Sequence, residues 1–355
     1  MENKREIIML EKYTITINYT VKMAIEKMKA EVIKAVIVID NDKSVVGLFS
    51  NGDMREFFLQ GGSLSDSITK AMNTEPKLYS SLEEIDNERK IMERVLYPIV
   101  DESNHLVRVI DYEKINKDEM VSDVLKDVPL VIMAGGKGTR LYPYTKILPK
   151  PLIPIGDVSI TERIINSFAK YGCKNVLMVL NHKASMIKAY MSELDTNYKI
   201  DFVKEDKFLG TAGGLHLVRD KINSTFILSN CDILIDDDIE CVYKTHKAKK
   251  NKITMVCSMK DVVIPYGVVE TNSDGTIKKM QEKPDFSFLI NTGVYIIEPE
   301  VLDDIGPDEF IHMPDLTQRY IDRGENVGVF PIPEKSWLDM GQFSEMENMM
   351  KNLGL

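Results

Sequence analysis

Glycine and basic residues follow a short apolar run near the middle of the chain. The run Pro129–Met133 leads directly into Ala134-Gly-Gly-Lys-Gly-Thr-Arg140, and Lys150 lies between two prolines shortly afterwards. Glycines let backbone N–H groups approach an anion with no Cβ in the way, and the prolines restrict the backbone on either side of the lysine. This combination predicts a polyphosphate site. The residues expected to line this site are Ala134, Gly135, Gly136, Lys137, Gly138 and Thr139, with Arg140 and Lys150 as its cations.

The glycine loop matches neither of the two common phosphate-binding patterns. It lacks G-x-x-x-x-G-K-[ST], and Leu141 stands where a dinucleotide-binding loop has Gly or Ala. A tight strand-to-helix turn with no ligand is the alternative for such a loop taken alone. Lys150, which lies between Pro149 and Pro151, favours a phosphate site over a turn without a ligand.

A carboxylate ends another apolar run, Phe226–Asp232. One or two carboxylates at a strand end suit Mg²⁺, which shares its remaining positions with substrate phosphates and water. We therefore expect Asp232 to be a metal ligand.

The elements that must position these residues alternate between strands and helices. Apolar runs predict strands near 176–180, 199–203, 225–229 and 252–259, and helical patterns lie near 186–191 and 238–249. Such alternation predicts an α/β domain with a mainly parallel, Rossmann-like sheet and helices on both faces. Ligands then bind beyond the carboxyl ends of the strands, where the glycine loop and Asp232 fall.

The chain before the glycine loop repeats internally. Val38–Phe49 aligns without gaps on Ile99–Ile110 at an offset of 61 residues, which indicates two copies of one α+β unit. We expect an N-terminal domain over residues 1–120, with copies at about 8–60 and 66–117, and a second domain over residues 121–355.

The run G-G-x-G-T-R-L followed by P-K-P resembles the signature of the sugar-nucleotide pyrophosphorylases, which are sugar-1-phosphate nucleotidyltransferases with a GT-A-like sheet. The resemblance implies transfer of a nucleoside monophosphate from an NTP to a sugar-1-phosphate, with release of pyrophosphate. It also implies that Asp232 and Asp339 hold a catalytic Mg²⁺, that Lys150 stabilises the α-phosphate, and that Arg140 stabilises the pyrophosphate.

Further segments resemble the same family. Leu209–Leu215 contains L-G-T-A-G, and the resemblance places Thr211, Ala212 and Gly213 against the nucleotide, with a helix N-terminus favouring phosphate. The segments Tyr266–Glu270 and Glu282–Pro284 flank the turn Asn272–Gly275, so we expect both segments to face one cleft. The residues that the resemblance assigns to the sugar phosphate are Gly267, Glu282, Lys283, Asn291 and Thr292.

The repeated N-terminal unit resembles a CBS (Bateman) domain pair, most clearly at Val46–Arg55. The resemblance implies a regulatory adenine or guanine nucleotide whose ribose contacts Ser50 and Asp53. Asp111 and Lys114 replace these residues in the second copy, so we expect at most one site. A packing domain without a ligand is the alternative. CBS pairs commonly associate, so a homo-oligomer is expected.

Composition narrows the function classes. The net charge of −10 argues against nucleic-acid binding, which depends on clustered Lys and Arg. No signal peptide or run of 18 apolar residues is present, so we expect a cytoplasmic protein with no membrane partner. No β-helix follows Asp339, so we expect no acetyltransferase.

The identities of the base and the sugar stay open. The chain resembles most the glucosamine-1-phosphate guanylyltransferases of legionaminic acid biosynthesis, which predicts GTP and glucosamine-1-phosphate. Guanine requires an acceptor for its N1 and N2 hydrogens, either Glu205 or a loop carbonyl. The alternatives are mannose- or heptose-1-phosphate guanylyltransferase, thymidylyl or uridylyl transfer, and a catalytically silent nucleotide-sensing protein.

Overall fold

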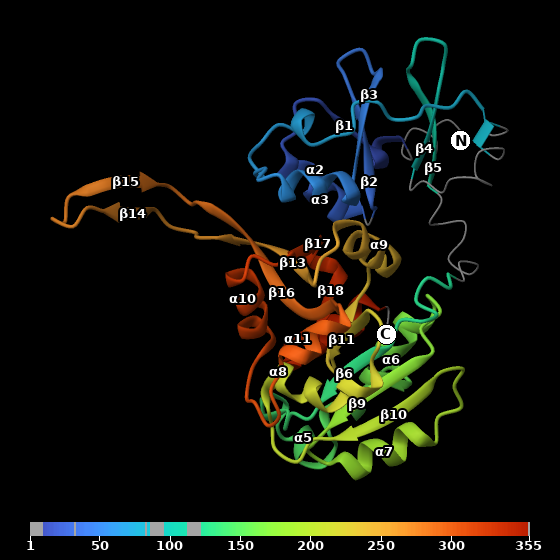
Figure 1. Ribbon diagram of the computed structural model, residues 1–355. Helices are drawn as coiled ribbons and strands as arrows, with labels where there is room; N and C mark the ends of the chain where they lie inside the picture. Colours follow the sequence, from blue (N-terminus) through green and yellow to red (C-terminus); the bar gives the residue numbers. More distant parts are fainter. Residues whose placement is uncertain (1–9, 32, 82–83, 86–95, 112–121, 354–355) are drawn as a thin grey trace. The chain divides into compact units, whose positions relative to one another are not determined.

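The chain divides into two compact units, Met1–Met120 and Val121–Leu355. The structure is a computed structural model that describes residues 10–31, 33–81, 84–85, 96–111 and 122–353 (Figure 1). Among these residues, no helix combines the length and the apolar character needed to cross a lipid bilayer.

Two similar hairpins lie in the N-terminal unit, and a third strand, β1, pairs in parallel with the first of them. Its elements are β1 (Thr14–Thr16), α2 (Val21–Glu31), β2 (Ala35–Ile39), β3 (Val45–Ser50), α3 (Asn51–Leu59), η1 (Ile68–Lys70), β4 (Leu96–Val100) and β5 (Leu106–Asp111). Ala35 pairs with Ser50 in the first hairpin and Leu96 with Asp111 in the second, and the register shifts after the fourth pair in both. Every pair repeats at an offset of 61 residues, as the internal repeat predicts.

A seven-stranded sheet organises the C-terminal unit, in the order β10-β9-β6-β11-β16-β13-β17. All neighbours are parallel except that β16 runs antiparallel to both β11 and β13. The predicted mainly parallel sheet is thus confirmed. The strands are β6 (Leu130–Ala134), β9 (Asn175–Leu180), β10 (Lys199–Lys204), β11 (Phe226–Asn230), β13 (Ile253–Val263), β16 (Asp285–Ile297) and β17 (Val327–Ile332).

Helices and small sheets surround this sheet. The α-helices are α5 (Tyr144–Ile147), α6 (Ile160–Ala169), α7 (Ala184–Ser192), α8 (Gly210–Gly213), α9 (Ile239–Lys249), α10 (Met313–Asp322) and α11 (Phe343–Asn352). The 3₁₀ helices are η3 (Thr139–Leu141), η4 (Lys150–Leu152), η5 (Gly214–Lys221), η6 (Pro299–Asp304) and η7 (Glu334–Ser336). The short strands pair as β7 (Pro154–Ile155) with β8 (Val158–Ser159), β12 (Ile233–Ile235) with β18 (Trp337–Asp339), and β14 (Val268–Thr271) with β15 (Ile277–Gln281).

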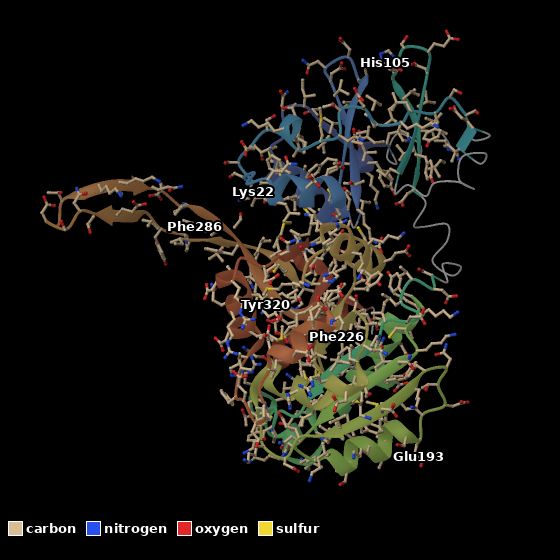
Figure 2. All side chains as sticks on the ribbon, viewed as in Figure 1. Lys22, His105, Glu193, Phe226, Phe286 and Tyr320 are labelled. Carbon is tan, nitrogen blue, oxygen red and sulfur yellow. The ribbon has the colours of Figure 1, made fainter. Side chains whose placement is uncertain are left out.

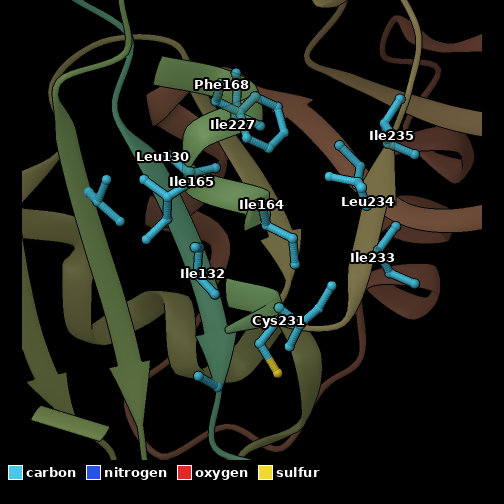
Figure 3. Close-up of a cluster of buried hydrophobic side chains, with 14 of the residues drawn as sticks. Leu130, Ile132, Ile164, Ile165, Phe168, Ile227, Cys231, Ile233, Leu234 and Ile235 are labelled. Carbon is cyan, nitrogen blue, oxygen red and sulfur yellow. The ribbon is translucent and has the colours of Figure 1, made fainter. Parts of the chain in front are cut away.

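Alternating strand residues build a core on each face of the sheet. Leu130 and Ile132 of β6 pack into one cluster with Ile164 and Phe168 of α6 (Figure 3), whereas Val131 packs into a second cluster beneath α8 and η5. Because successive side chains of a strand point to opposite faces, helices are required on both sides. The strand ends, and the loops that follow them, are therefore held from two faces.

Candidate active site

The glycine loop begins where β6 ends, at Ala134. Gly138 adopts φ 65°, and a Cβ built on it would lie 3.1 Å from both Lys150 Cβ and Thr145 Cγ2. A Cβ on Gly136 would meet no atom within 4 Å. The loop backbone thus packs against the stem of Lys150 at Gly138 and is open at Gly136, as a backbone cradle for an anion requires.

Lys150 brings its ammonium to the end of β11. Pro149 precedes Lys150 with φ −64°. The Nζ of Lys150 contacts Oδ2 of Asp232. The side chains of both residues are largely buried, at 11% and 12% exposed. The loop lysine and the strand-end carboxylate therefore occupy one place in the fold, although 82 residues separate them.

The second carboxylate reaches the same place through a short antiparallel ladder. Asp339 pairs with Ile233, the residue after Asp232, and the amide of Met340 donates to the carbonyl of Asp232 over 2.9 Å. A Cβ on Gly341 would lie 3.1 Å from Asp339 Oδ1 and 3.3 Å from Arg140 Nη1. Arg140, Lys150, Asp232 and Asp339 are thus brought together at one place in the fold.

Asp339 is held in an unfavourable environment for its charge. Burial raises the pKa of this carboxyl, and the negative charge of Asp232 raises it further, against the opposing effects of Lys150 and Arg140. Its Oδ1 is buried and has no hydrogen-bond partner among the described residues. A carboxylate oxygen left in this condition beside a second carboxylate suits a bound cation.

These two carboxylates fit Mg²⁺ as partial ligands. Within the described part of the chain, no cluster of three or more His, Cys, Asp or Glu side chains could hold a metal ion. Mg²⁺ does not need such a cluster, because it is commonly held by one or two carboxylates together with water and substrate phosphates. Asp232 and Asp339 are the residues that would hold it.

Glu205 lies beneath the start of the glycine loop. It is 2% exposed, and its Oε1 accepts the amide hydrogen of Leu209 over 2.9 Å. A Cβ on Gly135 would lie 2.9 Å from its Oε2, and burial raises the pKa of this carboxyl. One carboxylate oxygen is therefore anchored to the backbone and the other lies against the loop.

The L-G-T-A-G segment uses its amides within the protein. The amides of Ala212 and Gly213 both donate to the carbonyl of Ile311 over 3.1 Å, and the amide of Thr211 donates to Nδ1 of His312 over 3.3 Å. No hydrogen on these three amides is left for a phosphate, and α8 has only four residues. The expected help from a helix N-terminus is corrected accordingly, because a segment about 100 residues later in the chain caps these groups.

Asn291 and Thr292 lie where β16 joins the sheet, and both are engaged within the protein. The ladder between β13 and β16 shifts register between Met255 and Cys257, opposite these residues. Thr292 is buried and donates to the carbonyl of Val256 over 2.8 Å, and Asn291 Nδ2 donates to the hydroxyl of Tyr295 over 2.6 Å. Here Thr292 stabilises the bulge, and only Asn291 is partly exposed.

The remaining sugar-phosphate candidates lie on a two-stranded arm. Beyond the sheet, β13 and β16 stay paired to Val263 and Asp285, and β14 and β15 continue the arm outward (Figure 1). Figure 2 shows Phe286 on this arm. Glu282 and Gly267 lie together, since a Cβ on Gly267 would be 3.0 Å from Glu282 Oε2.

The arm separates these residues from the carboxylate pair. Lys283 precedes Asn291 by eight residues, which at 3.4 Å per residue spans about 27 Å of extended chain. Gly267 and Glu282, from the two segments expected to face one cleft, thus lie together, and the arm holds them away from Asp232 in this conformation. The reason is that the ladder between β13 and β16 continues without a break past Cys257.

One contact at the site was not predicted from the sequence. Nζ of Lys183 donates to the backbone carbonyls of Thr145, Lys146 and Ile147, over 3.0, 2.7 and 2.8 Å. These residues form the end of α5, between the glycine loop and Lys150. No local pattern in the sequence marks such a contact, because it joins segments more than 35 residues apart.

The two ribose-binding candidates of the N-terminal unit form the capping box of α3. The amide of Ser50 donates to Oδ2 of Asp53 over 2.8 Å, and the amide of Asp53 donates to Oγ of Ser50 over 3.3 Å. In the second copy, Asp111 accepts a hydrogen bond from the hydroxyl of Tyr13 over 2.6 Å. Lys114 lies outside the described residues. A structural role thus accounts for the contacts of Ser50, Asp53 and Asp111.

The chain is similar to curated nucleotidyltransferases and to a solved structure of the same fold. A uridylyltransferase for UTP and glucose-1-phosphate from Synechocystis is 32% identical over 60% of each chain, and so is a mannose-1-phosphate guanyltransferase from Schizosaccharomyces pombe. The chain thus spans about 60% of the length of these curated relatives. Among solved structures, HddC from Yersinia pseudotuberculosis shares the fold with a TM-score of 0.50 at 23% identity, over 64% of this chain and 99% of that one.

Family matches cover most of the chain. Residues 5–60 match the CBS domain. Residues 130–354, which contain the glycine loop, Lys150 and both carboxylates, match the nucleotidyl transferase family. This chain therefore belongs to the nucleotidyl transferase family.

Proposed function

We propose that the protein transfers a nucleoside monophosphate from an NTP to a sugar-1-phosphate and releases pyrophosphate. The observation that supports this most strongly is the convergence of Arg140, Lys150, Asp232 and Asp339 beside an open glycine loop. Two cations and two carboxylates at one place match the charges of a triphosphate and its metal ion. The curated relatives are named for the same class of reaction.

The residues present suit this chemistry without an acid–base pair. An oxygen of the sugar-1-phosphate is already ionised at neutral pH, so it attacks the α-phosphorus as the bond from the α-phosphorus to pyrophosphate breaks. Catalysis then consists of alignment and charge stabilisation. Lys150 stabilises the α-phosphate, and Arg140 and the loop amides stabilise the departing pyrophosphate. Mg²⁺, when bound at Asp232 and Asp339, neutralises phosphate charge.

The acceptor side involves the arm. Glu282 hydrogen-bonds the sugar hydroxyls and Lys283 binds the sugar phosphate, with Gly267 beside Glu282. A bend at the bulge around Asn291 brings these residues toward Asp232, because bulges locally bend a strand and interrupt its ladder.

The donor is GTP and the acceptor is glucosamine-1-phosphate, as in the glucosamine-1-phosphate guanylyltransferases of legionaminic acid biosynthesis. Guanine requires an acceptor for its N1 and N2 hydrogens, and a loop carbonyl suits this role better than Glu205, which is 2% exposed and already accepts the amide hydrogen of Leu209. The printed functions of the relatives include both guanylyl and uridylyl transfer. Mannose-1-phosphate is accordingly the second candidate acceptor, and UTP is the second candidate donor.

The N-terminal unit regulates this activity by binding an adenine or guanine nucleotide near Ser50 and Asp53. The CBS match over residues 5–60 supports this role. Binding must then open the mutual hydrogen bonds of the two side chains, and the coupling between effector and substrate should be about 1–3 kcal/mol. Identical activity and thermal stability with and without AMP, ATP, GMP and GTP analogues would contradict regulation.

The test of the reaction is a substrate grid in the presence of Mg²⁺. Pyrophosphate release is measured for GTP, UTP, dTTP, CTP and ATP, each with glucosamine-, N-acetylglucosamine-, mannose- and glucose-1-phosphate. Preference for GTP with glucosamine-1-phosphate is the expected result. Another productive pair would correct the substrates and keep the reaction, whereas silence across the grid would refute it.

A further inference from the structure

Lys183 uses all the hydrogens of its ammonium on one helix end. Its Nζ donates to three successive carbonyls, those of Thr145, Lys146 and Ile147, over 3.0, 2.7 and 2.8 Å. A lysine ammonium has three donors and no acceptor. The last carbonyls of a helix have no partner within the helix, so Lys183 closes the end of α5 from outside.

The backbone of Lys183 is held in a conformation that suits this contact. Its φ is 54°, in the left-handed region that residues other than glycine rarely adopt. It lies just after β9 and immediately precedes α7, and the nearby amide of His182 donates to the carbonyl of Gly135 over 3.4 Å. The ammonium is therefore carried by a segment anchored at the carboxyl end of the sheet.

The α5 helix connects this anchor to the glycine loop and to Lys150. Thr145 is 1% exposed, and its Oγ1 donates to the carbonyl of Gly138 over 2.8 Å. A Cβ built on Gly138 would lie 3.1 Å from the methyl group of Thr145 and 3.1 Å from the Cβ of Lys150. A shift of α5 would thus move the loop carbonyl and the stem of the lysine together.

We propose that Lys183 is a positioning residue, which fixes α5 and through Thr145 sets the distance between the glycine loop and the ammonium of Lys150. This inference rests on the proposed function, because that distance matters when the loop and Lys150 hold one triphosphate. Lys183 itself touches backbone carbonyls of the protein. A displacement of a reacting group by about 1 Å can lower a rate by about 100-fold.

The test compares Lys183→Met, Lys183→Arg and the matched control Lys199→Met. Methionine keeps an unbranched apolar stem and loses the donors, whereas arginine retains donors. Lys199 is on β10, its side chain is 72% exposed, and it pairs with Asp201. We expect kcat of Lys183→Met to fall about 10- to 100-fold with a change in the KM for NTP of less than about threefold. Lys183→Arg should recover most of the loss, and Lys199→Met should match the wild type.

A second readout does not depend on turnover. Hydrogen–deuterium exchange of peptides covering residues 139–150 should increase in Lys183→Met, while peptides from β9 and α7 keep their protection. This measurement tests the position of α5 even if the wild-type protein is silent in the substrate grid. Silence would refute the proposed function, whereas unchanged exchange would refute the role of Lys183.

Thr145→Val keeps the test decisive if Lys183→Met fails to fold. Valine fills the same space and removes the hydroxyl that donates to Gly138. It should lower kcat and increase exchange in the same segment, and the double variant should lose less than the product of the two single losses, because both act through α5. Wild-type kcat in Thr145→Val, or equal losses of kcat in Lys183→Arg and Lys183→Met, would overturn the proposal.

Discussion

Replacing Asp339 by asparagine should change activity and stability in opposite directions. The carboxyl is partly buried, its buried Oδ1 has no hydrogen-bond partner among the described residues, and burial and the negative charge of Asp232 raise its pKa. Asparagine has nearly the same shape and carries no charge. The substitution removes a partly buried charge, which should raise the free energy of unfolding. It also removes one of the two carboxylates proposed to hold Mg²⁺, which should lower the rate.

The expected rate loss is at least about 100-fold, the scale found when one well-placed electrostatic group is removed. This corresponds to about 2.7 kcal/mol in the barrier. The expected gain in the free energy of unfolding is about 1 kcal/mol, the lower end of the cost of a buried polar group with no partner. In a unit of this size, that gain raises Tm by about 2–4 °C.

The gain should depend on pH in a defined direction. The pKa of Asp339 is higher in the folded state than in the unfolded state, so folding favours its protonated form. Its contribution to stability is fully present below the unfolded pKa of about 3.9 and is lost as the pH rises through the folded pKa. Asp339→Asn should therefore gain more Tm at pH 7.5 than at pH 4.

The assay measures pyrophosphate release and thermal unfolding for Asp339→Asn and for Asp236→Asn. Asp236 is the matched control, because it follows the same short strand β12 and is exposed. The control should match the wild type in both measurements. Near-normal turnover in Asp339→Asn would remove it from the proposed metal site, and a clear loss of stability would refute the argument from its buried charge.

Three further predictions concern the loop, a buried histidine and the arm. Gly138→Ala should lower Tm and activity, because Gly138 has φ 65° and its Cβ would lie 3.1 Å from Lys150. Such a left-handed conformation costs a residue with a Cβ about 1–2 kcal/mol. Gly136→Ala, the control, should leave Tm unchanged in thermal unfolding. His246 is fully buried and burial lowers its pKa, so the unfolded state binds more protons and Tm should fall as the pH drops through about 6.5; His246→Gln should show a smaller fall between pH 7.5 and 5.5, and an equal fall would assign the effect elsewhere. Glu282→Gln should lower kcat/KM for the sugar-1-phosphate by about 10-fold, as expected for a hydrogen bond to a charged group, without changing NTP affinity by calorimetry; a changed NTP affinity alone would contradict its role on the acceptor side.

The parts of the site that lie at strand ends could be predicted from the sequence. Apolar runs place the glycine loop after β6 and Asp232 after β11, and these strands are parallel neighbours in the sheet. The carboxyl ends of parallel neighbours lie at the same edge, so the proximity of the two segments follows from the pattern of strands and helices. Asp339 was assigned by resemblance, and the ladder between β12 and β18 shows how it reaches the site.

The parts that depend on distant segments could not be predicted. The amides of α8 suggest an anion site until Ile311 is seen to accept their hydrogens, and nothing near Gly213 in the sequence indicates this. The arm is another example, because hairpin patterns predict β14 and β15 but not the direction in which their ribbon leaves the sheet. Lys183 likewise depends on a left-handed backbone conformation that only the folded chain reveals.

The repeat in the N-terminal unit, in contrast, could be predicted from the sequence. The 61-residue offset in the sequence recurs in every strand pair of the two hairpins. Turn chemistry repeats as well, since the Oδ1 atoms of Asp40 and Asp101 each accept two amide hydrogens in equivalent turns. Local patterns suffice here because each hairpin forms within about 16 residues of chain.

The most direct test of the central claim follows the α-phosphate. The wild-type protein is incubated with GTP labelled at the α-phosphorus, glucosamine-1-phosphate and Mg²⁺, and the products are separated. The proposed reaction predicts that the label moves into a nucleotide-sugar only when both substrates are present, and that Asp232→Asn and Asp339→Asn reduce this transfer by at least about 100-fold. Label that stays in GTP with every sugar-1-phosphate and every labelled NTP, or that appears as free nucleoside monophosphate, would contradict the account.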